Sequence, residues 1–512
     1  MLLQFVITLT IAISGWAHPD FSNINSYKSR LGFTTQYQKK AERRLKVAIF
    51  DKGFKGFESE LGRTLPADTR YIAGPVPAPE QGQTEHGLRM AQILVSLMTN
   101  DLQATQFVPE LSLYNVFGFS NLKAAVDSAI ANQVDLILYS EVWEYGGNSD
   151  GRGFINKEVS RATQAGIHWI NAAGNFETRT YNTVIATSND DWVQLPDQNQ
   201  ALKIICQSSN NKNCSLRAVL SWNDFKDDVD LGTDKDLDLA LTDDLLNIIQ
   251  VGGLKQTLEN DVKPGFSKYP REIITAELKP GTYFLRVKDR SKNFDLRDSL
   301  RITVDGDFIQ MPSATLGESL INPADNRNVI TVGANDSDRS SRSVRLGKPE
   351  ILAPSSLQFK DGKEYRGSSN AAAIVAAIAG LGLSQSQGDL SKDQLVRYIL
   401  KFSQNSRGLS LAELGFSFTG PGCFYRAQLG FTPDYVQRVL DQGGVLVQTT
   451  AGVRIMVPFD PVTLHTSLYR RQRNDMIVTL PQGYFVYNRL ALIPQGAAEV
   501  FQTPLEADLC AN

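Results

Sequence analysis

Three polar residues of this 512-residue chain stand at points where strands and helices would position them for hydrolytic chemistry. Asp51 follows an apolar run, His86 opens a helix-like run, and Ser369 begins a helix-like run of small residues. A serine hydroxyl attacks a carbonyl when a base removes its proton, and imidazole suits this role because it titrates near neutral pH. A carboxylate on the second ring nitrogen holds the tautomer and stabilises the imidazolium. These residue types predict nucleophilic acyl transfer.

A fourth residue, Asn175 in the stretch NAAGN, has the chemistry that is needed at the reacting carbonyl. Its side-chain amide can donate to the oxygen that becomes negative, and the backbone N–H of Ser369 would be the second donor. Because Ser369 begins a helix, the free N–H groups and the dipole of that helix favour the same negative charge. We therefore expect Asn175 and Ser369 to form an oxyanion hole.

The motifs VAIFDKG, EHG, NAAGN and GSSNAAA, with Asp, His, Asn and Ser in this order, make the chain resemble the subtilisin-like serine proteases, the subtilase or peptidase S8 family. The resemblance implies an α/β fold with a parallel-sheet catalytic domain. It implies a serine endopeptidase that cleaves protein or peptide substrates through an acyl-enzyme intermediate and requires no cofactor for catalysis. It also places substrate binding at Ser140, Glu141 and Gly174.

The residues flanking these motifs depart from the family pattern. At the histidine motif, Leu88 and Arg89 replace the family's Thr and His. At the serine motif, Ser368, Asn370 and Ala373 replace the family's Thr, Met and Pro. None of them removes a catalytic atom. They leave open an alternative, a catalytically weak or inactive homologue that binds a peptide or a partner, and an acyl hydrolase acting on esters is a third interpretation.

Two carboxylates stand on the expected substrate-side strand, where the family has small or apolar residues. If Glu141 or Glu144 faces the pocket, charge pairing would favour a basic side chain on the residue before the cleaved bond, the P1 residue. If both carboxylates point to solvent, no such preference follows.

The distance between the motifs indicates an insertion. Asp51 to His86 is 35 residues and His86 to Asn175 is 89, both ordinary for the family, whereas Asn175 to Ser369 is 194. The inserted stretch begins after the third motif and ends before the fourth.

The alternation of strand-like and helix-like runs divides the chain. We expect the catalytic domain at residues 46–178 and 313–405, because apolar strands alternate there with helical patterns as in βαβ units. Short strand-like runs without a helical period fill 179–312 and predict an inserted β-sandwich, similar to the jelly-roll domains appended to many secreted bacterial peptidases. A small β-rich region follows at 406–512, and residues 18–45 form a polar N-terminal extension.

The predicted sandwich contains a strongly acidic stretch, with nine Asp against two Lys between Asp224 and Asp244. Crowded carboxylates repel one another unless water or a cation such as Ca²⁺ separates them. The residues that we assign to a structural Ca²⁺ site are Asp228, Asp230, Asp236 and Asp238. An interpretation of equal weight is that these aspartates lie in acidic loops exposed to water and bind no cation.

The N-terminus and the cysteines both indicate export. Residues 1–17 resemble a signal peptide, although no Lys or Arg precedes the apolar run at 2–14. That run is shorter than the roughly 20 apolar residues that span a bilayer, so we expect a secreted or periplasmic protein without stable membrane insertion. The four cysteines predict two disulfides, Cys206–Cys214 stapling a hairpin and Cys423–Cys510 tying down the tail, and four free thiols are the alternative.

The charge balance argues against nucleic acid as a partner. The formal net charge is −3, and no basic stripe offers phosphate contacts along the chain.

Overall fold

A computed structural model defines most of the chain up to residue 402 and several strands beyond it. The residues described are 23–33, 40–77, 84–100, 102, 107–195, 199–208, 212–259, 262–295, 297–358, 364–402, 417–418, 445–449, 452–458, 475–480 and 483–488. The predicted signal peptide and the predicted Cys423–Cys510 disulfide lie outside these residues.

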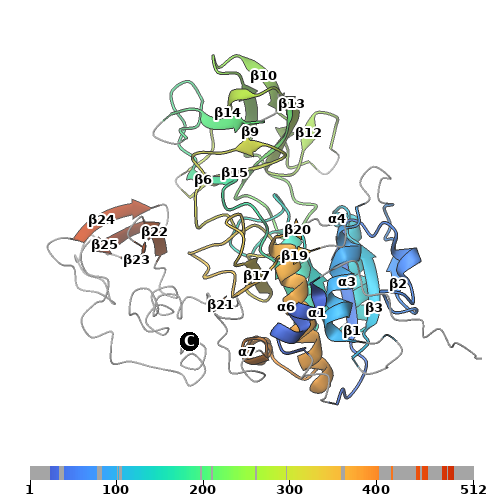
Figure 1. The fold of residues 1–512 in the computed structure, drawn as a ribbon. Helices are drawn as coiled ribbons and strands as arrows, with labels where there is room; N and C mark the ends of the chain where they lie inside the picture. The colour runs from blue at the N-terminus through green and yellow to red at the C-terminus, as the bar shows by residue number, and fades with distance from the viewer. Residues whose placement is uncertain are drawn as a thin grey trace, which may run out of the picture.

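A large, mostly parallel sheet forms the centre of the catalytic part (Figure 1). Its strands, in spatial order, are β2 (Arg70–Ile72), β3 (Glu110–Asn115), β1 (Lys46–Asp51), β4 (Leu136–Tyr139), β5 (His168–Ala172), β17 (Ile330–Ala334), β18 (Ile351–Ala353) and β21 (Ser417–Phe418). All neighbouring pairs are parallel except β18 and β21. The predicted α/β fold with a parallel sheet is confirmed.

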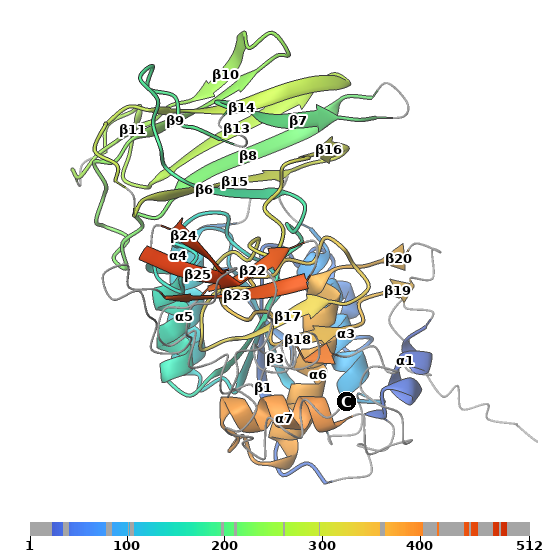
Figure 2. The ribbon, with the colours of Figure 1, turned by 90° about the vertical axis from the view of Figure 1, so that its left-hand side faces the viewer.

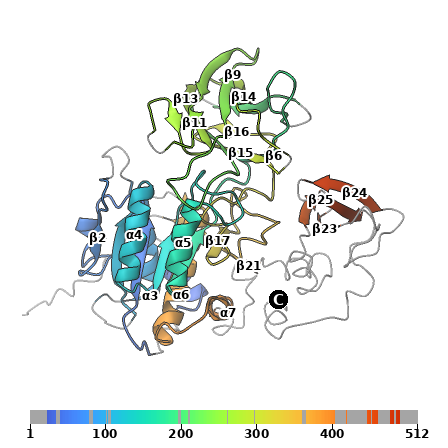
Figure 3. The same cartoon turned by 180° about the vertical axis from the view of Figure 1, so that it is seen from behind.

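Helices cover both faces of this sheet because its strands are apolar on both sides. The helices on one face are α1 (Ile24–Arg30), α3 (His86–Met98), α6 (Ser368–Gln385) and α7 (Lys392–Phe402). On the other face, visible in Figure 3, lie α4 (Phe119–Ala131) and α5 (Phe154–Gln164). Alternation along β1 shows the two layers: Val47 and Ile49 belong to the core under α3 and α6, and Ala48 and Phe50 to the core under α4 and α5.

In the sequence, residues 180–310 separate the two halves of the parallel-sheet domain. They form two antiparallel sheets, which we call the β-domain (Figure 2). The first sheet has the order β13 (Arg271–Leu278), β8 (Cys214–Trp222), β15 (Ser299–Asp305), β6 (Thr180–Val184). The second has the order β10 (Ile248–Gly252), β9 (Leu237–Thr242), β14 (Gly281–Asp289), β7 (Leu202–Cys206), β16 (Ile309–Gln310). Apolar residues of both sheets form one buried cluster between them. The short pair β11 (Lys255–Gln256) and β12 (Phe266–Ser267) is parallel.

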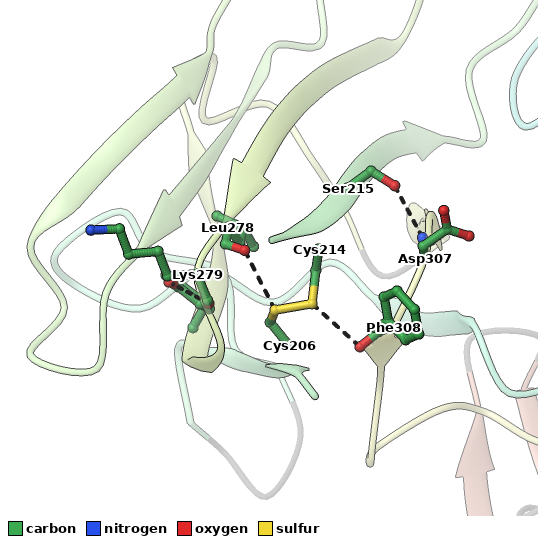
Figure 4. The surroundings of a disulfide bond; sticks show 8 residues. Cys206, Cys214, Ser215, Leu278, Lys279, Asp307 and Phe308 are labelled. Carbon is green, nitrogen blue, oxygen red and sulfur yellow. Dashed lines mark hydrogen bonds between the residues drawn. A yellow bond between two sulfur atoms is a disulfide. The ribbon is translucent and has the colours of Figure 1, made fainter. Parts of the chain in front are cut away.

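The disulfide between Cys206 and Cys214 is present, but it does not staple a hairpin (Figure 4). Cys206 ends β7 and Cys214 begins β8, and these strands belong to different sheets. The prediction of a hairpin was wrong because two strands adjacent in sequence need not pair: β8 pairs with β13 and β15 instead. The disulfide therefore crosslinks the two sheets of the β-domain, with the Cα atoms 5.8 Å apart.

The predicted polar extension contains a helix that packs into the core of the parallel-sheet domain. On α1, Ile24 and Tyr27 are buried in the core beneath α3, and the buried Lys28 ammonium donates to the carbonyl of Thr99 at 3.0 Å. The polar composition concealed this helix, since only one side of it is apolar. Its burial makes residues 24–33 part of the parallel-sheet domain.

The remaining elements are short or lie near the C-terminus. They are the 3₁₀ turn η1 (Phe57–Glu60), the pair β19 (Leu357–Gln358) and β20 (Glu364–Tyr365), and a four-stranded antiparallel sheet of β22 (Val445–Thr449), β23 (Gly452–Pro458), β25 (Gly483–Asn488) and β24 (Asp475–Leu480). Among the described residues, no helix is long and apolar enough to cross a membrane.

Candidate active site

The carboxylate of Asp51 and the imidazole of His86 meet at the carboxyl end of the sheet. Asp51 is the last residue of β1 and is fully buried, and His86 is the first residue of α3. His86 Nδ1 lies 2.7 Å from Asp51 Oδ2, a hydrogen bond within ordinary N–H···O distance. The backbone N–H of Gly53 donates to the other carboxylate oxygen at 3.3 Å. This is the aspartate–histidine arrangement that the sequence predicted.

Glycine brings the start of α3 against the end of β1. The Gly87 N–H donates to the carbonyl of Gly53 at 2.9 Å. A Cβ atom on Gly87 would stand 2.6 Å from the Cβ of Asp51 and 2.6 Å from the ring of Phe54, closer than real atoms approach. A larger residue after His86 would therefore push the imidazole away from its carboxylate.

Charges around His86 favour its protonated form. Burial lowers the pKa of the imidazole, but the carboxylates of Asp51 and then Glu141 outweigh it and raise that pKa to about 9, while the Lys52 ammonium opposes the rise. The balance of these charges therefore stabilises the imidazolium relative to the neutral ring in the free protein.

Ser369 stands in the first turn of α6, a helix of small residues buried against the sheet. Gly367 precedes the helix with φ 151°, a conformation that other residues adopt only under strain. Ser369 Oγ donates to the carbonyl of Ser140 at 2.9 Å. The residue after Ser140 is Glu141, and one of its carboxylate oxygens lies within 4.8 Å of ligand atoms of both Asp51 and His86. The Ser140–Glu141 segment thus links the serine to the histidine side of the site.

The amide of Asn175 is held in one orientation. Its Oδ1 accepts from the backbone N–H of Ser368 at 3.1 Å, and Ser368 Oγ accepts from the N–H of Gly174 at 3.0 Å. Because Oδ1 is occupied, Nδ2 is the atom left to donate, and it makes no hydrogen bond to any described residue. At the helix start, the first N–H groups, which include that of Ser369, have no intrahelical acceptor. Both predicted oxyanion donors therefore lie at the same end of α6.

A pocket with a volume of about 270 Å³ opens beside these donors. The residues that line it are Ser140, Glu141, Val142, Gly174, Asn175, Phe176, Asp305, Ser337, Arg339, Arg366, Ser368 and Ser369. The structure thus brings together the substrate-binding residues predicted from the sequence, Ser140, Glu141 and Gly174. Asp305 comes from the end of β15, so the β-domain contributes to one wall.

The two glutamates considered for P1 selection have different surroundings. Glu141 lines the pocket and forms an ion pair with Lys52. Glu144 does not line it, and instead pairs with Arg217 of the β-domain at 3.1 Å. Glu144 therefore helps to hold the β-domain against the catalytic part. Sequence reasoning missed Lys52, whose only signal was its place directly after Asp51.

The four aspartates assigned to calcium are not gathered around one point. Asp230 pairs with Lys268 at 3.4 Å, and Asp238 with Arg290 at 2.6 Å. Burial, and then the charge of Asp238, raise the pKa of Asp236 to about 6. Within the described residues, no three of the assigned carboxylates approach one another closely enough to share a metal ion. The Ca²⁺ site stays a prediction.

Comparison with known proteins gives one matching family model and several similar solved structures. Residues 291–417 match the model of the subtilase family, a stretch that includes Ser369. Among solved structures, the chain resembles the CspB protease of Clostridium perfringens at 12% identity and a TM-score of 0.39, over 70% of this chain and 87% of that one. It also resembles MycP1 from Mycobacterium smegmatis (15% identity, TM-score 0.32, 76% of this chain and 80% of that one). A cold-adapted subtilisin-like serine proteinase matches at 14% identity and a TM-score of 0.31, over 73% of this chain and 88% of that one.

No curated protein sequence matches the chain. The family match does not depend on the structural likenesses. It covers β17, β18 and α6, the second half of the parallel-sheet domain, together with the serine motif predicted from the sequence. Residues 291–417 of this chain are therefore similar to the subtilase family of serine proteases.

Proposed function

We propose that the chain is an exported endopeptidase that hydrolyses peptide bonds with Ser369 as nucleophile, His86 as general base and Asp51 as the carboxylate that orients the base. The observation that carries the proposal is the 2.7 Å contact between His86 Nδ1 and the buried Asp51 carboxylate. A carboxylate there accepts from Nδ1–H, which leaves Nε2 of the neutral ring free to take the proton of a serine hydroxyl.

The reaction begins when Ser369 Oγ exchanges its bond with the Ser140 carbonyl for one with His86 Nε2. As Oγ attacks the substrate carbonyl, its proton passes to His86 and the carbonyl oxygen becomes negative. That oxygen accepts from Asn175 Nδ2 and from the Ser369 N–H. The imidazolium then protonates the leaving amine, and water hydrolyses the acyl-enzyme by the same route.

The location of the enzyme is part of the proposal. Residues 1–17 would direct export and be removed at Ala17. The disulfide between Cys206 and Cys214 supports an oxidising compartment, where such bonds form and persist.

Cleavage of defined peptides tests the proposed function. Purified protein should cut a mixed peptide library, with new termini identified by mass spectrometry. A His86→Ala variant serves as the matched control, because it removes the base and leaves Ser369 in place. Equal cleavage by both proteins, or none by the wild type, would contradict the proposal.

The Asn175→Ala variant tests the oxyanion hole. We expect kcat to fall about 10²–10³-fold with little change in KM, because the bond from Nδ2 strengthens as the negative oxygen develops. Steady-state kinetics on one peptide substrate measure both constants. An effect on KM alone would assign Asn175 to ground-state binding instead.

The pH dependence of the reaction follows from His86. Its raised pKa, about 9, means that the free enzyme must lose a proton before His86 can act as a base. We therefore expect kcat/KM to rise about tenfold per pH unit below that value and to level off above it. A profile already flat from pH 7 would show that His86 is neutral there.

A further inference from the structure

Two ionisable side chains that the proposed mechanism does not use act on His86: Glu141 lies close to it, and Lys52 pairs with Glu141. Glu141 follows β4 and Lys52 follows β1, so two neighbouring strands of the sheet present them at the same edge. Glu141 Oε2 and Lys52 Nζ form an ion pair. One carboxylate oxygen of Glu141, one ring nitrogen of His86 and one carboxylate oxygen of Asp51 all lie within 4.8 Å of one another.

The two members of this pair differ in exposure. The Glu141 side chain is 14% exposed, whereas that of Lys52 is 49% exposed. Glu141 is therefore held in a partly dry environment, where a charge acts more strongly on its neighbours than in water. Lys52 can turn its ammonium toward solvent if its partner is removed.

We propose that Glu141 and Lys52 are positioning residues that set the charge state of the catalytic base: Glu141, with Asp51, stabilises the His86 imidazolium, and Lys52 limits that stabilisation. The inference rests on the proposed role of His86. It extends that role by a second carboxylate, that of Glu141, close to the histidine.

Other charges near His86 are accounted for. Next to His86, Glu85 at the N-cap of α3 pairs with Arg89 of that helix at 3.0 Å. From the sheet, three charges act on the imidazole. Asp51 and then Glu141 stabilise the imidazolium, and Lys52 destabilises it. Burial and the Asp51 charge raise the pKa of Glu141, and Lys52 opposes that rise. The ammonium thus favours the ionised form of Glu141 beside a second carboxylate.

The opposite signs of the two residues give opposite expected effects. Glu141→Gln keeps the shape of the side chain and removes a negative charge, so the imidazolium loses stabilisation. Lys52→Met removes the opposing positive charge, so the imidazolium gains stabilisation. A structural role for the ion pair would instead affect both variants in the same direction.

Proton titration of the histidines by NMR measures this directly. The chain has four histidines, and the His86 signal is assigned by its loss in His86→Gln. In a Ser369→Ala background, which prevents self-cleavage, we expect Glu141→Gln to lower the His86 midpoint by about one pH unit and Lys52→Met to raise it. Glu144→Gln is the matched control, since Glu144 lies three residues after Glu141 and pairs with Arg217. The His86 midpoint in this variant should equal that of the parent protein.

The outcomes separate this inference from the proposed function. If Glu141→Gln leaves the midpoint at the parent value, or if both variants shift it the same way, the inference is overturned. If Glu141→Gln does not fold, as judged by circular dichroism, the Lys52→Met midpoint alone decides: an increase supports the inference, and no change overturns it. The NMR result does not need activity, so an inactive wild type with the expected midpoints would overturn only the proposed function. In an active enzyme, the acid limb of kcat/KM should move with each midpoint.

Discussion

Replacing Ser369 with alanine is expected to lower kcat for peptide hydrolysis by about 10⁴–10⁶-fold. The variant loses the only atom that forms the acyl-enzyme, while binding and the oxyanion donors remain. The fold should be unaffected, because alanine is a good helix former and the helix already contains a run of alanines after this position. Initial rates with a fluorogenic peptide and a melting curve measure the two effects.

Ser384→Ala is the matched control for this variant. Ser384 lies on the same helix, is buried, and its hydroxyl makes no hydrogen bond to a described residue. Its loss should leave kcat unchanged. Rates for Ser369→Ala within tenfold of the wild type would assign the nucleophile to another residue, and Ser368 would then be tested next.

Asp51→Asn is expected to lower kcat about 10⁴-fold near neutral pH. Asparagine fits the same buried position and can still accept from the Gly53 N–H, so the fold should persist. Its amide can donate to His86 Nδ1, which stabilises the tautomer with the proton on Nε2 and removes the base. Rates measured from pH 6 to 10 test this.

The same variant should also change the titration of His86. Without the Asp51 carboxylate, which is the strongest of the charges that raise the pKa of this histidine, the NMR midpoint of His86 should fall. A variant that keeps both its rate and the wild-type midpoint would show that Asp51 does not act on His86.

The sequence predicted the parts of the site that sit at the ends of regular elements. Asp51 at the end of β1, His86 at the start of α3 and Ser369 in the first turn of α6 all follow from apolar periodicity and from where it stops. Each is a local feature, since the pattern that forms the element also fixes its boundary. The order of the motifs then indicated how the elements combine.

Features that depend on which strands become neighbours could not be predicted in this way. Glu141 meets His86 because β4 pairs with β1, a relation that no spacing in the sequence expresses. The Cys206–Cys214 bond joins two sheets for the same reason, since the residues that pair with β7 and β8 lie 50 or more positions further along the chain. Tertiary pairing, not local propensity, decides both.

Labelling with a fluorophosphonate probe tests the central claim most directly, because the probe reacts with a serine only when a neighbouring base activates it. We expect mass spectrometry of the purified wild-type protein to locate the label on Ser369, and His86→Ala to prevent labelling. The rate of labelling should increase between pH 7 and about 9, as His86 loses its proton. A wild-type protein that stays unlabelled across this range, or a label on any other serine, would contradict the assignment of Ser369 and His86 as nucleophile and base.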